Sequence, residues 1–232
     1  MIKKILFALT LTTLLALQVS AASVLDGKII GLDAGHGNGT TGAIGACGSV
    51  NVIEADVNLA VRTELTKLIE DNTNGTVHPI ARLSTRKDRV ADAEANGSDI
   101  LISIHHNGSS DTSVDYTKSF VTQKNDRELA KVIHPKLVSV FGPDKGIKND
   151  GYGMTVYGSL PGVLTESYFI TNTNNACDFL DYEAGVANTM VHQEAQAMYD
   201  GLLEYFSQSG GDDDGNGGGK PDKCSPWPSC RN

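Results

Sequence analysis

Two patterns of apolar residues alternate along the chain, and together they predict strands separated by helices. Short, nearly continuous apolar runs bounded by glycine or polar residues are typical of buried strands, and a run that alternates apolar with polar residues is typical of an exposed one. On this basis we expect strands at residues 28–33, 77–83, 100–104, 116–122, 154–157 and 162–165.

Apolar residues spaced three or four positions apart predict the helices between these strands. The run that begins at Glu54 places Val57, Val61 and Leu65 on one face, with charged residues between them. Pro135 should bend or restart the third helix. We expect helices at residues 54–71, 86–96, about 127–140 and 184–206, and a loop at residues 35–48.

The alternation of strands and helices predicts the fold class. We expect a single α/β domain with a twisted, mostly parallel or mixed sheet of about six strands and helices on both faces. In sheets of this kind, ligands bind at the carboxyl ends of the strands. Polar side chains that directly follow strands are therefore the first candidates for a functional site.

The two ends of the chain differ from the expected domain. Residues 1–21 combine a basic start, an apolar run and small residues, which is typical of a secretory signal peptide. An uncleaved anchor is the alternative, but the apolar run is short for a bilayer span. We therefore expect a folded domain at residues 22–208, followed at 209–232 by a flexible linker rich in glycine and aspartate and a short cysteine-containing tail.

Charge excludes one class of function. The formal net charge of the chain is −9, and removal of a signal that carries Lys3 and Lys4 and no acids would lower it to −11. A chain this acidic, with no basic cluster in its sequence, is not expected to bind nucleic acid. After removal of the signal we also expect no attachment to a membrane.

Four cysteines in an exported chain indicate disulfide pairing. Cys224 and Cys230 could close a small loop in the tail, whereas Cys47 and Cys177 would have to meet across the fold. Three connectivities are possible, and the sequence does not choose among them. A zinc site made of thiolates is disfavoured because the chain has no CxxC pair.

Two histidines and one glutamate form the candidate metal site. His36 follows the first expected strand, His105 follows the third, and Glu54 begins a helix. Two imidazoles and one carboxylate are a ligand set of catalytic zinc, which keeps a further position open for water. The alternatives are a histidine that only caps a loop and a first-turn glutamate stabilised by the helix dipole.

Glu166 provides a further carboxylate after the last strand. A buried carboxylate without a partner would be costly, so a role in proton transfer is favoured over a structural role. The adjacent His105 and His106 should point to opposite sides of their strand, so only one of them should bind the metal. Asn107 would contact the site or cap the next turn, and Asp33 would support His36 or shape its turn.

Two arginines near the expected site have two interpretations. Arg86 and Arg89 would either contact carboxylates of a substrate or pair with nearby aspartates to fix the fold. We favour the structural interpretation. The remaining histidines His78, His134 and His192 are expected to face solvent or to have hydrogen-bond partners within the fold.

Five segments, in order, resemble the zinc-dependent N-acetylmuramoyl-L-alanine amidases of the amidase 3 family. The resemblance covers residues 28–206. The segments are LDAGHG at 32–37, E-x-x-x-N-L at 54–59, Thr85-Arg86 and Arg89 with Asn96, SIHHN at 103–107, and LTESYFITN at 164–172.

The resemblance implies an α/β fold and hydrolysis of the amide between the lactyl group of N-acetylmuramic acid and L-alanine. Carried over by position, His36, Glu54 and His105 match the ligands of one Zn²⁺ per chain, and Glu166 matches the catalytic glutamate. The chain departs from the family at His106, where a small residue is usual, and at Tyr168, where glycine is usual. His106 and Asn107 are the candidates for substrate contact, and Asp33 is the candidate for support of the ligands.

Together these observations predict an exported, monomeric zinc amidase that acts on peptidoglycan or muropeptides in the periplasm or at the cell wall. One alternative is a zinc metallopeptidase that cuts within the stem peptide, although the chain lacks the HExxH motif of the commonest class. The other alternative is a wall-binding module without activity. That module would be expected to lack a ligand or Glu166, and neither is missing.

Overall fold

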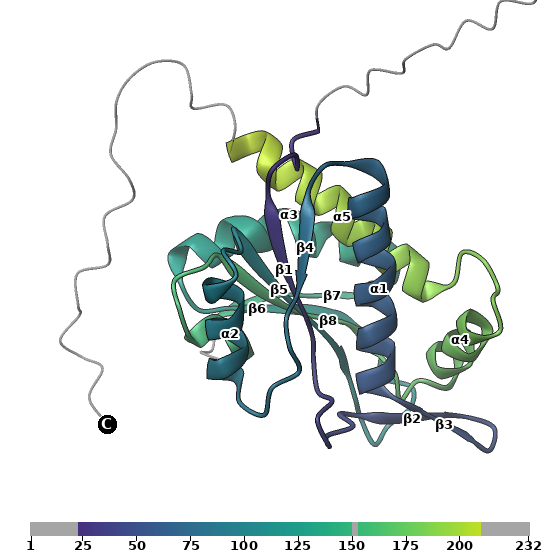
Figure 1. Cartoon of the computed structure of the whole chain (residues 1–232). Helices are drawn as coiled ribbons and strands as arrows, with labels where there is room; N and C mark the ends of the chain where they lie inside the picture. The colour runs from purple at the N-terminus through teal and green to yellow at the C-terminus, as the bar shows by residue number, and fades with distance from the viewer. Residues whose placement is uncertain (1–22, 150–152, 210–232) are drawn as a thin grey trace, which may run out of the picture.

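A six-stranded mixed sheet forms the centre of the molecule (Figure 1). The computed structural model describes residues 23–149 and 153–209, so the expected signal peptide and tail lie outside the described residues. The strand order is β4-β1-β5-β8-β6-β7, and only the β6–β8 pair is antiparallel. The strands are β1 (Ile29–Ala34), β4 (Thr76–Pro79), β5 (Ile100–Asn107), β6 (Thr117–Val121), β7 (Asp144–Asn149) and β8 (Gly162–Phe169).

Helices cover both faces of the sheet, as predicted. Helices α1 (Glu54–Asn72), α3 (Lys124–Phe141) and α5 (Met190–Ser209) cover one face, and α5 packs against both α1 and α3. They enclose the main apolar core with the inward side chains of the sheet. The other face carries α2 (Arg86–Ala95) and the one-turn 3₁₀ helix η1 (Gly153–Val156) over a smaller apolar cluster. Among the described residues, no helix has both the length and the apolar character needed to cross a membrane.

One predicted element is wrong, and another begins later than predicted. The strand expected at residues 154–157 is the turn η1, because Gly153 adopts a φ of +74° and the N–H of Tyr157 donates to the carbonyl of Met154 at 3.2 Å. The closing helix begins at Met190 rather than at 184, since residues 184–189 form a turn in which Gly185 and Asn188 both have positive φ. Pro135 does not restart α3, which runs without a break from Lys124 to Phe141.

Four elements lie where none was predicted. A hairpin of β2 (Ile44–Cys47) and β3 (Val50–Ile53) forms in the expected loop. Helix α4 (Thr173–Glu183) precedes the closing helix, and β7 forms the edge of the sheet.

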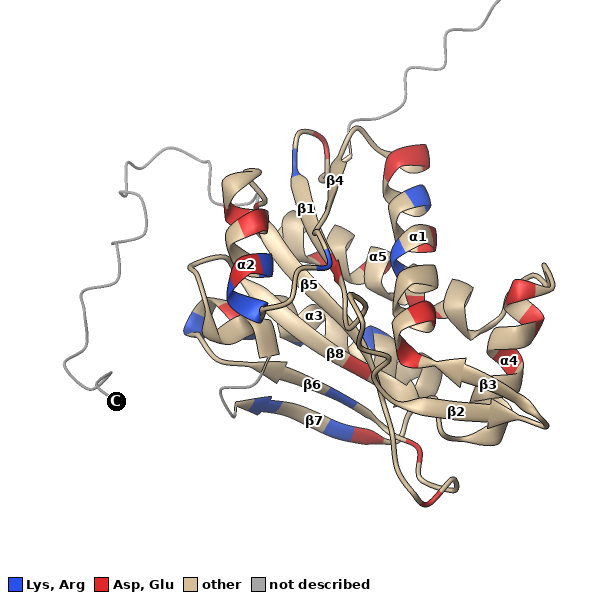
Figure 2. Cartoon of the chain, turned by 60° about the horizontal axis from the view of Figure 1, so that its bottom comes forward, with Lys and Arg blue, Asp and Glu red and all other residues tan. Residues whose placement is uncertain are grey.

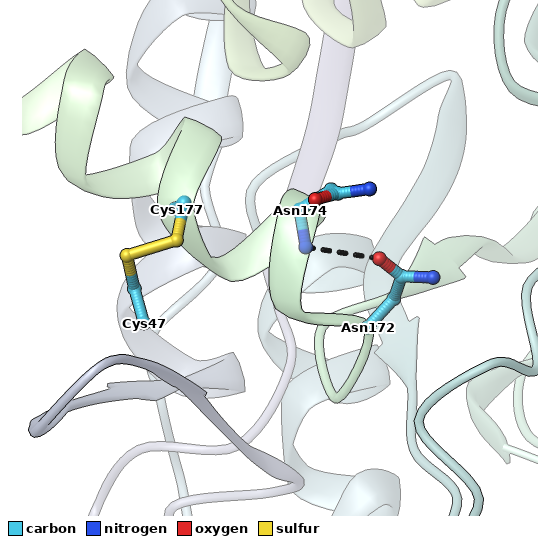
Figure 3. Close-up of a disulfide and its surroundings, with 4 residues drawn as sticks. All are labelled: Cys47, Asn172, Asn174 and Cys177. Carbon is cyan, nitrogen blue, oxygen red and sulfur yellow. Dashed lines mark hydrogen bonds between the residues drawn. A yellow bond between two sulfur atoms is a disulfide. The ribbon is translucent and has the colours of Figure 1, made fainter.

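A disulfide between Cys47 and Cys177 fastens the hairpin to α4 (Figure 3). The two Cα atoms lie 4.9 Å apart, and 130 positions separate the residues in sequence. At the start of the same helix, the side chain of Asn172 accepts a hydrogen bond from the N–H of Asn174 at 3.0 Å. This disulfide is one of the pairings that the sequence left open; Cys224 and Cys230 lie outside the described residues.

Candidate metal centre

Three potential ligands meet at one end of the sheet. The ligand atoms of His36, Glu54 and His105 all lie within 4.8 Å of one another, and no second group of this kind is found among the described residues. His36 Nε2 lies 3.2 Å from Glu54 Oε2, and His105 Nδ1 lies 2.9 Å from Glu54 Oε1. The two imidazole centroids are 4.9 Å apart, with the rings nearly perpendicular.

Parallel pairing of neighbouring strands brings the two histidines together. Strand β1 runs beside β5, and the N–H of Gly35 donates to the carbonyl of Ile104 at 3.0 Å, so the segment after β1 stays next to β5. His36 then adopts a φ of +61°, which is uncommon for a residue with a side chain. Its carbonyl accepts hydrogen bonds from Arg82 Nε at 3.3 Å and Arg89 Nη2 at 2.8 Å, and these two bonds hold the turn in place.

Glu54 is the first residue of α1, and its carboxylate is almost completely buried. Oε2 accepts the N–H of Ala43 at 2.8 Å, and Oε1 accepts the N–H of His106 at 3.2 Å. Burial opposes ionisation of Glu54, but hydrogen bonds with His105, His36 and the N–H of Ala43 outweigh it and hold the pKa well below its usual range. The carboxylate is therefore available as an anionic ligand.

Two glycines leave room for the ligands. A Cβ on Gly35 would lie 2.3 Å from Cε1 and Nε2 of His105, and a Cβ on Gly42 would lie 2.3 Å from Oε2 of Glu54. Both separations are far shorter than ordinary contact distances. Gly35 and Gly42 therefore permit a close approach of the backbone to the ligands that any larger residue would prevent.

Glu166 lies beside the three ligands without a partner of its own. Its Cα is paired with that of His105 across the β5–β8 ladder, and its Oε2 is buried with no hydrogen bond. The residue lies within β8 rather than at its end, because the strand continues to Phe169. Burial, aided by the negative charge of Glu54, raises the pKa of Glu166 to about 7.

A cavity of about 430 Å³ connects these groups to solvent. Asn107 and Arg86 also line it. Asn107 Oδ1 accepts the N–H of Gly108 at 3.0 Å, so its side chain caps the following turn, and contact with a substrate stays a prediction. A concave site that holds converging ligands and an unpartnered carboxylate is typical of a catalytic centre.

The His106 ring lies on the side of β5 away from the three ligands, and its contact with a substrate stays a prediction. As the strand geometry required, this is the side opposite His105, and the residue is only 1% exposed. Nδ1 lies 2.7 Å from Asn58 Oδ1, and Nε2 lies 2.8 Å from Glu194 Oε2 on α5. Both ring nitrogens are therefore occupied inside the core, although the residue also borders the cavity.

Tyr168 does not narrow the cavity, because β8 contains a bulge. His105 pairs with Glu166, but Asn107 pairs with Phe169, so β8 has one extra residue in this stretch. Ser167 and Tyr168 consequently both face the helices: Ser167 Oγ donates to Glu194 at 2.6 Å, and the ring of Tyr168 packs on His106 with centroids 4.3 Å apart.

Asp33 is linked to the turn at His36 through an arginine. Its Oδ1 accepts from Arg89 Nη1 at 2.9 Å and its Oδ2 from Ser103 Oγ at 2.8 Å, and Arg89 in turn bonds the carbonyl of His36. Arg89 therefore has the structural role that we favoured, with Asp33 as its acidic partner.

The other histidines have hydrogen-bond partners, as expected. His78 bonds Asp92, His134 bonds Ser119 and Asp144, and His192 bonds Thr189.

Three residues that shape the site were given no role from the sequence, although Asn58 is the asparagine of the E-x-x-x-N-L segment at 54–59. Asn58 lies one helical turn after Glu54 and donates to Gly35 O at 3.1 Å and to Glu54 Oε1 at 3.4 Å. Its position four residues after a candidate ligand on a helix was a usable signal. Glu194 was visible as an acid on the apolar side of a helix. Arg82, which also donates to the carbonyl of Ala55 at 2.7 Å, carried no such signal.

Comparison with known sequences finds a matching family and similar proteins. The family model described as N-acetylmuramoyl-L-alanine amidase matches residues 30–201. The uncharacterized protein YqiI of Bacillus subtilis is 35% identical over 204 residues, which cover 84% of this chain and 92% of that protein. The N-acetylmuramoyl-L-alanine amidase LytC of Bacillus subtilis is 28% identical over 207 residues, which cover 82% of this chain but only 39% of that longer protein.

Solved structures share the fold. The catalytic domain of CwlV, an N-acetylmuramoyl-L-alanine amidase from Bacillus (Paenibacillus) polymyxa var. colistinus, superposes with a TM-score of 0.65 at 24% identity and covers 78% of this chain and 98% of its own. The CwlD amidase from Clostridioides difficile, solved in complex with the GerS lipoprotein, gives a TM-score of 0.62 at 24% identity over 78% of this chain and 99% of its own. At this level of identity the likeness establishes the fold.

Proposed function

The chain belongs to the N-acetylmuramoyl-L-alanine amidase family, and on that premise we propose that it hydrolyses the amide between the lactyl group of N-acetylmuramic acid and L-alanine in peptidoglycan. The observation that carries the proposal is the convergence of His36, Glu54 and His105 around one point, with the unpartnered carboxylate of Glu166 beside them. An acid–base group next to a set of metal ligands is the arrangement that metal-assisted hydrolysis requires.

We propose that the three ligands hold one Zn²⁺ per chain. The donor set of two imidazole nitrogens and one carboxylate fits zinc. Gly35 and Gly42 leave free the space around His105 and Glu54 that a Cβ would fill. When bound, zinc polarises the scissile carbonyl and makes a water molecule a better nucleophile at neutral pH.

Glu166 supplies the proton transfers in this proposal. Its carboxylate accepts a proton from the attacking water and then donates one to the departing nitrogen of L-alanine. The second transfer is required because an amine leaves readily only after protonation. The raised pKa of Glu166, about 7, suits a group that must both accept and release a proton near neutral pH.

Other side chains keep the reacting groups in position. Asn58 donates to both Glu54 and the carbonyl of Gly35, so it links the helix that carries one ligand to the turn that carries another. Arg82 and Arg89 hold the carbonyl of His36 in its left-handed turn. These contacts set the orientation of the ligands before a substrate arrives, which lowers the cost of reorganisation during the reaction.

We further propose that the enzyme is exported through cleavage of residues 1–21 and acts as a monomer in the periplasm or at the cell wall. The pattern of residues 1–21 supports export. A wall polymer outside the membrane can be reached only by an exported enzyme.

The test is to digest purified peptidoglycan and identify the products by mass. The proposed reaction releases a peptide with free N-terminal L-alanine and leaves a lactyl carboxylate on the glycan. A chelator should stop the digestion, and added Zn²⁺ should restore it. Cleavage between two stem-peptide residues would show a peptidase instead, and intact peptidoglycan with zinc-loaded protein would favour a binding module.

A further inference from the structure

The row of side chains that contains His105 and Glu166 continues across the sheet. Glu166 on β8 is paired in register with His105 on β5 on one side and with Lys118 on β6 on the other. Paired residues on adjacent strands project to the same face. The ammonium group of Lys118 therefore lies on the face that carries the metal ligands, one strand beyond the catalytic carboxylate.

Two more lysines extend this row onto β7, the edge strand. The ammonium groups of Lys118 and Lys145 lie 5.3 and 5.5 Å from the centroid of the Tyr116 ring, and Lys118 is also 5.3 Å from the ring of Phe120. Lys148 is paired with Phe120 and so shares its face. We call Lys118, Lys145 and Lys148 the lysine strip. Figure 2 shows blue segments on β6 and β7 near a red segment on β8.

No ammonium group of the lysine strip lies within salt-bridge distance of a carboxylate among the described residues, although Lys118 opposes the rise in the pKa of Glu166 and Lys148 lowers the pKa of Asp144 at longer range. By contrast, Lys67, Lys131 and Lys136 each pair with a glutamate. The nearby acids have other partners: Asp144 bonds His134 on the α3 side of the sheet, and Asp115 accepts from Phe169 and Asn175.

Three cations that form no salt bridge among the described residues, two of them beside aromatic rings, in a chain with 28 acids and 19 bases provide a local site for an anion.

We propose that the lysine strip binds a free carboxylate of the stem peptide, on the side of the scissile amide that leaves with L-alanine. This inference rests on the proposed function, because it uses Glu166 and the metal ligands to fix where the amide lies. The substrate class it selects is a stem peptide with an acidic residue after L-alanine, in preference to one whose carboxylate is amidated.

The dimensions agree with this assignment. Adjacent strands are ~4.8 Å apart, so β6 and β7 lie roughly 5 and 10 Å from the strand of Glu166. An extended peptide advances ~3.3 Å per residue, so the second or third stem residue lies roughly 7–10 Å beyond the scissile amide. A carboxylate on either residue reaches the strip when the peptide runs across the strands from the metal centre toward β7.

The test compares two soluble muramyl-peptides that differ only in whether the second stem residue carries a carboxylate or a carboxamide. The zinc-loaded protein should have a kcat/KM about three- to fivefold higher for the carboxylate form, mainly through KM, as expected for partly exposed ion pairs. The preference should shrink as ionic strength rises. A Lys145→Gln/Lys148→Gln variant should bring the ratio close to one. The ratio does not depend on how much of each preparation is active.

A charge-matched control separates this site from a general effect of charge. Lys67→Gln/Lys131→Gln removes the same two charges from exposed positions on α1 and α3 and should keep the wild-type ratio. Equal hydrolysis of both peptides by the wild type, or an unchanged ratio in the β7 variant, would overturn the inference while leaving the proposed function intact. Hydrolysis of neither peptide would instead contradict the proposed function.

Discussion

At the scale of single residues, the space around the metal ligands matters as much as the ligands themselves. Gly35 carries no functional group, yet its hydrogen in place of a Cβ lets the His105 ring approach to within contact of the backbone. The sequence showed the glycines that flank His36. Only the structure shows that Gly35 makes room for the ring of His105 rather than for that of the adjacent His36.

Gly35→Ala should weaken metal binding. The added Cβ would lie 2.3 Å from the His105 ring and must displace it from Glu54. We expect the dissociation constant for Zn²⁺ to rise by about tenfold or more, a size typical of changes that misorient a ligand. Metal titration with a competing chelator measures it. Gly162→Ala is the control, since its nearest contact would be an ordinary 3.6 Å; similar metal affinity in both variants would contradict this view.

His106→Ala should lower stability while leaving the metal bound. The ring bonds Asn58 and Glu194 inside the core, and its loss leaves a buried carboxylate short of a partner. We expect the free energy of unfolding to fall by about 3–5 kcal/mol, measured by urea denaturation. His78→Ala, whose ring bonds the partly exposed Asp92, should cost about 1 kcal/mol or less. Loss of metal in His106→Ala and not in His105→Ala would show that the wrong histidine had been assigned.

The candidate ligands could be located from the sequence because each stands next to a strand or helix end with a clear pattern. The surrounding contacts could not. Arg82 and Glu194 lie 46 and 88 positions from the residues they bond, His36 and His106, and such pairings depend on the packed fold. For His106, strand alternation gave the side on which the ring lies but not the residues that cover it.

At the scale of elements, the apolar strands and long amphipathic helices were predictable, and the elements that depend on tertiary contacts were not. Strand β7 reads DKGIKN, with one large apolar residue, and forms by pairing with β6. The strands of the β2–β3 hairpin are only four residues long each and read IGAC and VNVI, and α4 has only 11 residues, with Ala176 and Phe179 as its buried apolar side chains. Both are joined by the disulfide, which the sequence could not assign.

Loss of this disulfide should destabilise the domain. The bond closes a loop of 130 positions, so it strongly restricts the unfolded chain. A Cys47→Ser/Cys177→Ser variant should lose about 2–5 kcal/mol of unfolding free energy in urea. Reductant should lower the stability of the wild type and leave the variant unchanged. A variant as stable as the oxidised wild type would show that the bond contributes little.

At the scale of the whole molecule, one domain contains every group that the proposed chemistry needs. The metal ligands, Glu166 and the lysine strip all lie on β5, β6, β7, β8, the turn after β1 and the start of α1. The mixed sheet of about six strands, with helices on both faces, was predicted correctly from the alternation of apolar patterns. The tail after Ser209 contributes no residue to this set.

Ending the chain at Ser209 should leave the chemistry intact. The composition of residues 210–219, only glycine, aspartate and asparagine, provides nothing apolar to bury. We expect the truncated protein to hydrolyse soluble muropeptides with a kcat/KM close to that of the longer chain. Binding to whole cell-wall sacculi, measured by co-sedimentation, should fall if Trp227 contributes to attachment. A truncated protein that is folded but inactive on small substrates would contradict the prediction.

The proposed mechanism requires Glu166 to carry protons without being a metal ligand. One substitution tests both properties. Glu166→Gln keeps the size of the side chain but cannot accept a proton. Metal content and turnover of a muropeptide should be measured on the same preparation. We predict one zinc per chain, as in the wild type. The turnover rate should fall by a factor of ~10² to 10⁴ or more, which is the usual contribution of general acid–base catalysis to the rate. Loss of zinc, or turnover near that of the wild type, would contradict this role of Glu166.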